Sequence, residues 1–165
     1  MGWRERERRQ GFGIDFFAVI APYREVGGWV QPLVNSFGEG QVILACRERN
    51  GVLEFFVRAA AERGLATTSA LAPSFVRYPG AIAEPPAWLL EPQGKLWCST
   101  TESDEGGRFY RDASVYQVIR VDDSSVPRNE TGAWVTLSEL KIMLRMSNVC
   151  TIQLRGIVSQ LLAVT

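Results

Sequence analysis

The fold is decided by one stretch of the sequence, Gln41-Val-Ile-Leu-Ala-Cys-Arg-Glu48-Arg49-Asn50-Gly51-Val52-Leu-Glu-Phe-Phe-Val-Arg-Ala-Ala60. It holds two apolar runs, 41–48 and 52–60, on either side of Asn50-Gly51. Asn-Gly between such runs is the strongest short signal for a two-residue hairpin turn. The alanines after Arg58 leave a helix over 52–61 open, but Phe55-Phe56-Val57 favours a strand. The stretch therefore predicts an antiparallel hairpin.

The segments around this hairpin predict more strands, followed by two helices. Apolar, β-rich runs predict strands at 14–22, 29–34, 95–100 and 115–121, and the proline-rich segment 79–94 predicts a loop with one helical turn near 88–90. Thr136 and Glu139 form a capping box that opens a helix to about Met146. Ile157, Val158, Leu161 and Leu162 mark a second amphipathic helix. This order predicts an α+β fold, with helices packed against a curved mixed or antiparallel sheet.

Composition limits the function classes. The chain of 165 residues is 46% hydrophobic, which fits one domain over 1–165 with a flexible N-terminal segment at 1–12. Acids and bases balance at 18 each, so no net charge steers the protein to nucleic acid or an anionic membrane. The first ten residues are charged, unlike a signal peptide, and no apolar run reaches membrane-spanning length. We therefore expect a soluble, cytoplasmic protein.

The chain has no histidine, and this restricts its chemistry. A Ser-His-Asp triad, a Cys-His pair and a histidine-based metal site are all excluded. The three cysteines, Cys46, Cys98 and Cys150, are too widely spaced for a zinc or disulfide pattern. Catalysis would have to use carboxylates, tyrosines, arginines or backbone dipoles.

Three further segments carry a family resemblance. They are Arg24-Glu-Val-Gly-Gly-Trp-Val-Gln-Pro-Leu33, Ser103-Asp-Glu-Gly-Gly-Arg-Phe-Tyr110 and Trp134-Val-Thr-Leu-Ser-Glu-Leu140. Their order and spacing resemble the NDP-hexose 2,3-dehydratases of antibiotic biosynthesis, over roughly 14–162 and most closely in the C-terminal of that family's two repeats. The resemblance implies a Nudix-like α+β fold. It also implies elimination of water β to a carbonyl, without cofactor or metal.

The chain departs from the family pattern at the expected pocket. After Ala72-Pro73 it has Ser74-Phe75-Val76 where the family usually has Thr-Val-Gln, and it carries Glu54 and Arg58 where the family commonly has His and Gln. These changes alter the polarity of the pocket, which questions recognition of a nucleotide sugar. Nudix-type pyrophosphate cleavage is not expected, because the segment 58–64 has only one carboxylate, Glu62, for Mg²⁺.

The candidate catalytic residues lie in and after the glycine-flanked segment. Glu105 is the first candidate for the base that removes a C–H proton next to a ketone. Tyr110 and Tyr116 could donate to an enolate or protonate a leaving hydroxyl. Arg108 could bind a carbonyl, enolate or phosphate oxygen with its two-pronged guanidinium. The alternatives are a solvated turn carboxylate, half-buried strand tyrosines and an exposed ion pair.

The candidate substrate-binding residues are spread along the chain. Trp29 and Gln31 lie in the stretch that resembles the family's pocket wall, where an indole can stack on a ligand or belong to the core. Arg58 and Glu62 could line the cavity as a pair or form a surface salt bridge. Ser74 occupies the altered pocket position. Trp134 and Arg155 are interpreted as structural.

The leading functional hypothesis is a cofactor-independent lyase of secondary metabolism. It would dehydrate a β-hydroxy ketone of polyketide type, with an optional Michael-type addition that closes a ring. The alternatives are a true 2,3-dehydratase of a nucleotide-linked 4-keto-6-deoxyhexose and a non-catalytic partner or ligand-binding subunit. Because a lone repeat would expose the surface that packs two repeats together, we expect a homodimer. Pairing with a different half-length protein is the competing hypothesis.

Overall fold

A mixed sheet forms the body of the protein. The computed structural model describes residues 11–61, 67–90, 93–122, 124 and 126–164. Strands β3 (Gly40–Arg49) and β4 (Val52–Ala60) form the predicted hairpin. Asn50 and Gly51 both have left-handed backbone angles, with φ of 52° and 75°, as a two-residue turn of this kind requires.

The rest of the sheet is built around this hairpin. Its strand order is β5-β4-β3-β8-β7, with β6 also paired to β3 and β9 to β4. Strands β7 (Gly94–Ser103) and β8 (Ala113–Val121) correspond to the predicted pair at 95–100 and 115–121. Strand β8 runs parallel to β3, whereas the other pairings are antiparallel. The short strands β5 (Ala70–Ala72), β6 (Phe75–Arg77) and β9 (Ala133–Thr136) were not predicted.

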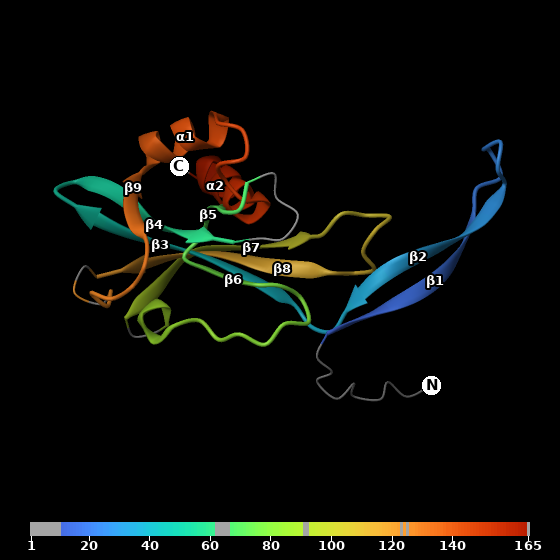
Figure 1. Cartoon of the computed structure of the whole chain (residues 1–165), viewed down its shortest axis with the longest axis horizontal. Coiled ribbons are helices and arrows are strands. Elements are labelled where there is room, and N and C mark those ends of the chain that lie inside the picture. Colours follow the sequence, from blue (N-terminus) through green and yellow to red (C-terminus); the bar gives the residue numbers. More distant parts are fainter. Residues whose placement is uncertain (1–10, 62–66, 91–92, 123, 125, 165) are drawn as a thin grey trace.

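Helices α1 (Leu137–Arg145) and α2 (Ile152–Val164) lie together on one face of the sheet (Figure 1). They cover a core made of Val42, Leu44, Cys46, Phe55, Val57, Val118, Leu140, Leu154, Ile157, Val158 and Leu161. The capping box of Thr136 and Glu139 starts α1 as predicted. The α+β class, with a mixed sheet and two packed helices, is confirmed. No helix in the described part of the chain is both long and apolar enough to span a membrane.

A smaller core lies on the opposite face of the sheet. The single turn η1 (Ala87–Leu89), predicted near 88–90, buries Trp88 and Leu89 there against Ile43 and Ile119. Trp134 packs edge-on against Phe56, with ring centroids 5.2 Å apart. The structural interpretation of Trp134 is therefore confirmed.

Strands β1 (Phe12–Ile20) and β2 (Gly28–Ser36) form a separate two-stranded sheet. We call residues 12–36 the arm. It extends away from the end of the main sheet (Figure 1), and its strands pair with each other along their whole length, from Phe12 opposite Ser36 to Ile20 opposite Gly28. The predicted flexible segment 1–12 thus ends inside β1, and residues 1–10 lie outside the described residues.

Candidate functional site

The loop that joins β7 to β8 connects the main sheet to the arm. We call residues 104–112 the connecting loop. The backbone N–H of Val34 donates to the Arg108 carbonyl at 3.0 Å, and the N–H of Tyr110 donates to the Val34 carbonyl at 2.7 Å. The predicted segment 103–110 therefore lies against the predicted segment 24–33 and the residues that follow it, although more than 70 residues separate the two.

Side chains strengthen this connection along the arm. The Gln31 amide donates to the Gly107 carbonyl, and the Trp29 indole N–H donates to the Gln31 side-chain oxygen at 3.2 Å. The Tyr110 ring packs on Phe17 with centroids 4.5 Å apart. The structure thus places four predicted site residues, Trp29, Gln31, Arg108 and Tyr110, on the arm and the loop that contacts it.

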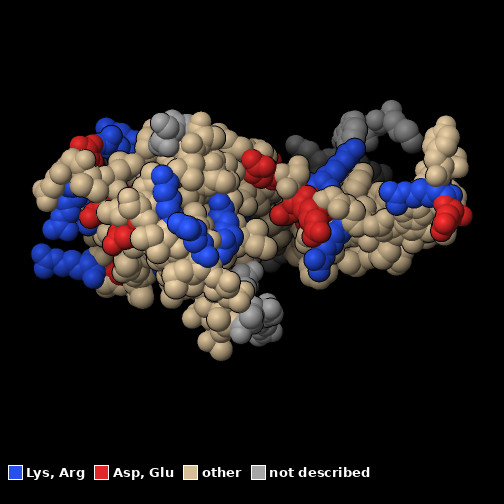
Figure 2. All heavy atoms as spheres, turned by 90° about the horizontal axis from the view of Figure 1, so that it is seen from above, with Lys and Arg blue, Asp and Glu red and all other residues tan. Residues whose placement is uncertain are grey.

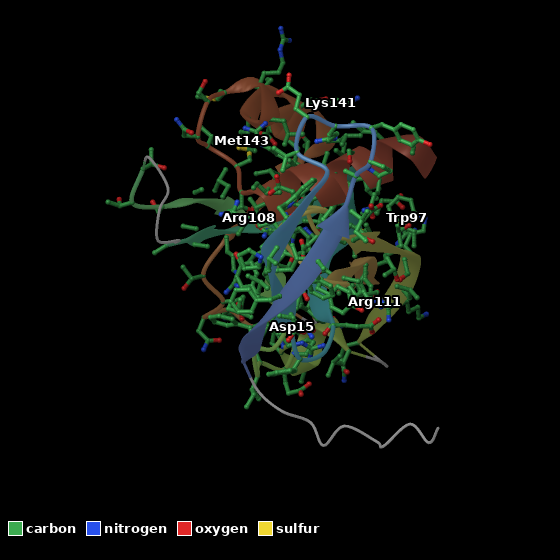
Figure 3. The ribbon with its side chains drawn as sticks, turned by 90° about the vertical axis from the view of Figure 1, so that its right-hand side faces the viewer. Asp15, Trp97, Arg108, Arg111, Lys141 and Met143 are labelled. Atoms are coloured by element: carbon green, nitrogen blue, oxygen red, sulfur yellow. The ribbon has the colours of Figure 1, made fainter. Side chains whose placement is uncertain are left out.

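Glu105 and Arg108 lie at the exposed turn of the connecting loop. Their side chains are 71% and 72% exposed, respectively, and are 3.6 Å apart. A pair this exposed contributes little to stability, so the fold does not need these side chains in that position. In the view along the arm, Arg108 and Arg111 lie on opposite sides of β1 (Figure 3). Both charges are therefore accessible to an anionic ligand at the base of the arm.

Tyr116 lies in a different environment, on the face of β8 that helix α2 covers. A Cβ atom added to Gly156 of α2 would lie only 3.3 Å from Cε1 of the Tyr116 ring, so the glycine makes room for the phenol. Partial burial raises the pKa of Tyr116, and the nearby carboxylates of Asp104 and Glu102 raise it further. The phenol therefore remains protonated and able to donate a hydrogen bond.

Asp104 begins the connecting loop and is the carboxylate that most affects Tyr116. Its backbone N–H donates to the carbonyl of Asp112 at 3.0 Å, which closes the loop at its base. Desolvation raises the pKa of Asp104, and the neighbouring charge of Asp112 adds to this effect. A carboxyl group with a raised pKa is a better proton donor near neutral pH than an ordinary one.

Glu102 completes the polar cluster. It lies opposite Ser114 in the β7–β8 ladder, and its carboxylate accepts a hydrogen bond from the Gln160 amide of α2 at 3.2 Å. We call Glu102, Asp104 and Tyr116 the acid–phenol cluster. Of these three residues, only Tyr116 was predicted from the sequence. Glu102 and Asp104 join it only because β7 pairs with β8 and the loop between these strands closes.

Ser74 and Arg58 have structural partners away from this cluster. The buried Ser74 hydroxyl donates to the Phe56 carbonyl at 2.7 Å and accepts from the Ala45 N–H at 2.8 Å. Arg58 donates to the Pro73 carbonyl at 3.3 Å. Glu62, the predicted partner of Arg58, lies outside the described residues. The structure therefore does not bring Ser74 and Arg58 together with the candidates on the connecting loop.

Two further features concern metal ligands and surface hollows. The described residues contain no group of three or more histidine, cysteine, aspartate and glutamate side chains arranged to hold a metal ion. A shallow, open hollow at the tip of the arm is lined by Tyr23, Arg24, Glu25, Val26 and Trp29. The turn at the tip of the arm, residues 21–27, lies at the far end of the arm from the connecting loop (Figure 1).

The fold is an α+β domain, and its acid–phenol cluster combines carboxyl and phenol groups, which are residue types capable of proton transfer. Comparison with known proteins gives the family. A family model described as NDP-hexose 2,3-dehydratase matches residues 2–161. The chain belongs to this family, which confirms the resemblance found in its sequence.

Three curated relatives are similar to this chain. All three are called dTDP-4-dehydro-6-deoxy-alpha-D-glucopyranose 2,3-dehydratase and are 30% identical to it. The matches cover 91% of this chain and 33% of the protein from Saccharopolyspora spinosa, 96% and 39% for Streptomyces violaceoruber, and 96% and 36% for Amycolatopsis orientalis. The chain therefore spans about a third of the length of these relatives.

Among solved structures, the chain is similar to an Ap4A hydrolase from C. elegans. The two share 13% sequence identity with a TM-score of 0.46, over 76% of this chain and 98% of the hydrolase.

Proposed function

We propose that this chain catalyses elimination of water β to a ketone in a nucleotide-linked 4-keto-6-deoxyhexose. The feature that carries the proposal is the acid–phenol cluster, in which Tyr116 lies on the same face of the β7–β8 ladder as Glu102, next to the loop that begins at Asp104. The family and its 2,3-dehydratase relatives favour this substrate over the polyketide-type ketone of the leading sequence hypothesis.

The proposed reaction divides the proton transfers between residues of the connecting loop. Glu105 takes the proton from the carbon next to the ketone, and a C=C bond forms as the hydroxyl leaves the following carbon. Asp104 gives that hydroxyl a proton, so that it departs as water. Tyr116 donates a hydrogen bond to the enolate oxygen.

The other predicted site residues of the arm and the connecting loop also have roles in this proposal. Arg108 binds an oxygen of the diphosphate with its exposed guanidinium. Trp29 offers its indole face to the base or the sugar, and Gln31 orients that indole through their hydrogen bond. Tyr110 is a second phenol within the connecting loop, and its ring packs on Phe17.

The test is incubation of the purified chain with the nucleotide-linked 4-keto-6-deoxyhexose, followed by mass spectrometry. The expected result is a product lighter by one water. In deuterated water, exchange of the proton next to the ketone should continue when Asp104 is replaced by Asn, because Glu105 still removes it. Absence of both exchange and dehydration with the unmodified chain would count against the proposal.

A second candidate substrate is a β-hydroxy ketone without a nucleotide, whose enone could close a ring by Michael-type addition. Two altered pocket positions favour it. Glu54 forms a salt bridge with Arg47 at 2.7 Å, and Ser74 is bonded only to backbone groups within the sheet. Titration calorimetry with thymidine diphosphate separates the candidates, because micromolar binding fits only the nucleotide-linked sugar.

The third hypothesis, a non-catalytic ligand-binding or partner subunit, makes a different prediction. Replacing Glu105, Arg108 or Tyr116 singly would then leave product formation by this chain and its partner enzyme unchanged. A loss of product with any of the three would favour the enzyme.

We also propose that the chain forms a homodimer. The support is its large exposed apolar surface, which is unusual for a soluble monomer. Light scattering at micromolar concentration should give about twice the chain mass of 18.4 kDa. A mass near that of one chain would contradict the homodimer and favour pairing with a different protein.

A further inference from the structure

We infer that one face of the arm is the interface with a second copy of this chain, and that the two arms pack face to face about a twofold axis. This inference rests on the proposed homodimer and names the surface that forms it. We call this surface the apolar arm face. Its members are Phe12, Ile14, Phe16, Ala18 and Ile20 of β1 and Val30, Pro32 and Val34 of β2.

The register of the arm places these eight residues on one side. Alternate residues of a strand point to the same face, and residues directly opposite in an antiparallel pair share that face. Val34 lies opposite Ile14, Pro32 opposite Phe16, and Val30 opposite Ala18. The two strands therefore contribute to a single continuous apolar surface.

This surface is exposed in the single chain. The side chains of Phe12, Phe16, Ile20 and Val30 are 66%, 72%, 82% and 65% exposed, respectively. A two-stranded ribbon with an uncovered apolar face is at best marginally stable in water. The apolar arm face therefore needs a covering partner.

The other face of the arm is already occupied by the chain itself. Phe17 on that face packs against Tyr110, and Gln31 is bonded to Gly107. Asp15 and Asn35 are bonded to each other at 2.6 Å. The connecting loop therefore covers much of this face, and a partner can bind the arm on the apolar arm face.

The area suits an interface between proteins. A fully buried aromatic side chain covers about 150–250 Å². On this scale, the exposed side chains of the apolar arm face present roughly 600 Å² of apolar surface per chain. A standard interface buries about 800 Å² per partner. Charged side chains gather at the base and the tip of the arm, with uncharged atoms along most of the length between them (Figure 2). None of the eight side chains of the apolar arm face itself carries a charge, as is typical of the centre of a protein interface.

A second copy is the occupant that best matches this surface. All eight side chains lack charge and hydrogen-bonding groups, so they select for an apolar surface of matching shape. An identical face related by a twofold axis is self-complementary. With the axis near Phe16 and Ala18, the Phe12 end of one arm meets the Ile20 end of the other. The charged segment 1–10, with four arginines and two glutamates, is poorly suited to cover such a face.

Cysteine cross-linking tests the face itself. Ala18→Cys places a thiol on the apolar arm face near the axis, and Val19→Cys places one on the opposite face, one residue away. After mild oxidation, A18C should run as a covalent dimer on a non-reducing gel, whereas V19C and the unmodified chain should not. Equal cross-linking of A18C and V19C, or none of A18C, would overturn the inference even if light scattering shows a dimer.

A charge on the same face provides a second test. Phe16→Glu should weaken the dimer by roughly 30-fold or more, as expected for a central interface residue. The matched control is Ile142→Glu on α1, which is 62% exposed and should leave the dimer intact. Circular dichroism confirms that both variants retain the folded body. A folded F16E that remains as dimeric as I142E would overturn the inference. Neither test depends on activity, so the proposed dehydration is tested separately.

Discussion

Ser36 of the arm and Asp112 of the connecting loop form a double hydrogen bond. The Ser36 N–H donates to one carboxylate oxygen at 3.0 Å, and its hydroxyl donates to the other at 2.5 Å. Asp112 is only 5% exposed, so these two bonds supply partners to its buried carboxylate oxygens. This contact joins the arm to the main sheet next to Asp104.

Replacement of Ser36 by Ala should lower the free energy of unfolding by about 1–3 kcal/mol, because one buried carboxylate oxygen loses its donor. Urea denaturation measures this change. Ser99→Ala, at an exposed position of β7, is the control and should change stability by less than about 0.5 kcal/mol. Equal effects of the two variants would mean that the Ser36–Asp112 contact does not support the fold.

Replacement of Tyr116 by Phe should lower kcat about 100-fold for the proposed dehydration, because the donor to the enolate is lost. The ring still packs against Gly156, so the thermal stability should change little. Tyr110→Phe is the matched control, since it removes a phenol hydroxyl from the other tyrosine while keeping the stack on Phe17. A larger loss with Y110F than with Y116F would move the donor role to Tyr110.

Asp104 should make the protein less stable as the pH rises. Because its pKa is raised in the folded protein, folding favours the protonated form. The stabilisation by protonated Asp104 is fully present below the pKa that Asp104 has in the unfolded chain. It is lost as the pH rises through the pKa that Asp104 has in the folded protein. Asp104→Asn should therefore gain stability relative to the unmodified chain between acidic and neutral pH. Urea unfolding at several pH values measures the difference, which Asp122→Asn should not reproduce.

Arg155 should stabilise the segment that joins α1 to α2. Its guanidinium donates to the carbonyls of Leu144 at 2.7 Å, Met146 at 3.1 Å and Cys150 at 3.4 Å. Arg155→Ala should cost about 2 kcal/mol of unfolding free energy, because these carbonyls lose a charged donor. Chemical denaturation provides the measurement, with Arg145→Ala as the comparison. If both arginines cost the same, the structural interpretation of Arg155 is wrong.

The three cysteines should differ in reactivity. Cys46 is fully buried, and burial raises its pKa to about 12, so it holds almost no thiolate at neutral pH. Cys150 is also buried, whereas Cys98 is only half-buried. A chromogenic disulfide reagent should therefore react first with one thiol in the native protein and with all three in denaturant. Cys98→Ser should remove the fast reaction, and its persistence would contradict this order.

Local patterns determined the elements that are stabilised by their own residues. Asn50 and Gly51 accept positive φ at low cost, so they specify the β3–β4 turn without help from the rest of the chain. Thr136 and Glu139 bond to each other across the first turn of α1, which the sequence spacing alone predicts. The family segments likewise identified the chain's relatives correctly.

Tertiary structure alone decided how these elements are arranged. The short strands β5, β6 and β9 depend on neighbours in the sheet and carry too few residues to show a period. The strands predicted at 14–22 and 29–34 correspond to β1 (Phe12–Ile20) and β2 (Gly28–Ser36), but their separation from the main sheet was not predicted. Which strands pair depends on contacts between distant residues, and periodicity within one strand cannot report those contacts.

The candidate site shows the same division. The absence of histidine and the glycine-flanked segment 103–110 indicated carboxylates and phenols as candidate catalytic groups from the sequence alone. The neighbours that alter the proton affinity of Tyr116 became visible only when the connecting loop closed between Asp104 and Asp112. Residue type is a property of the sequence, whereas desolvation and the proximity of charges depend on where the folded chain places each group.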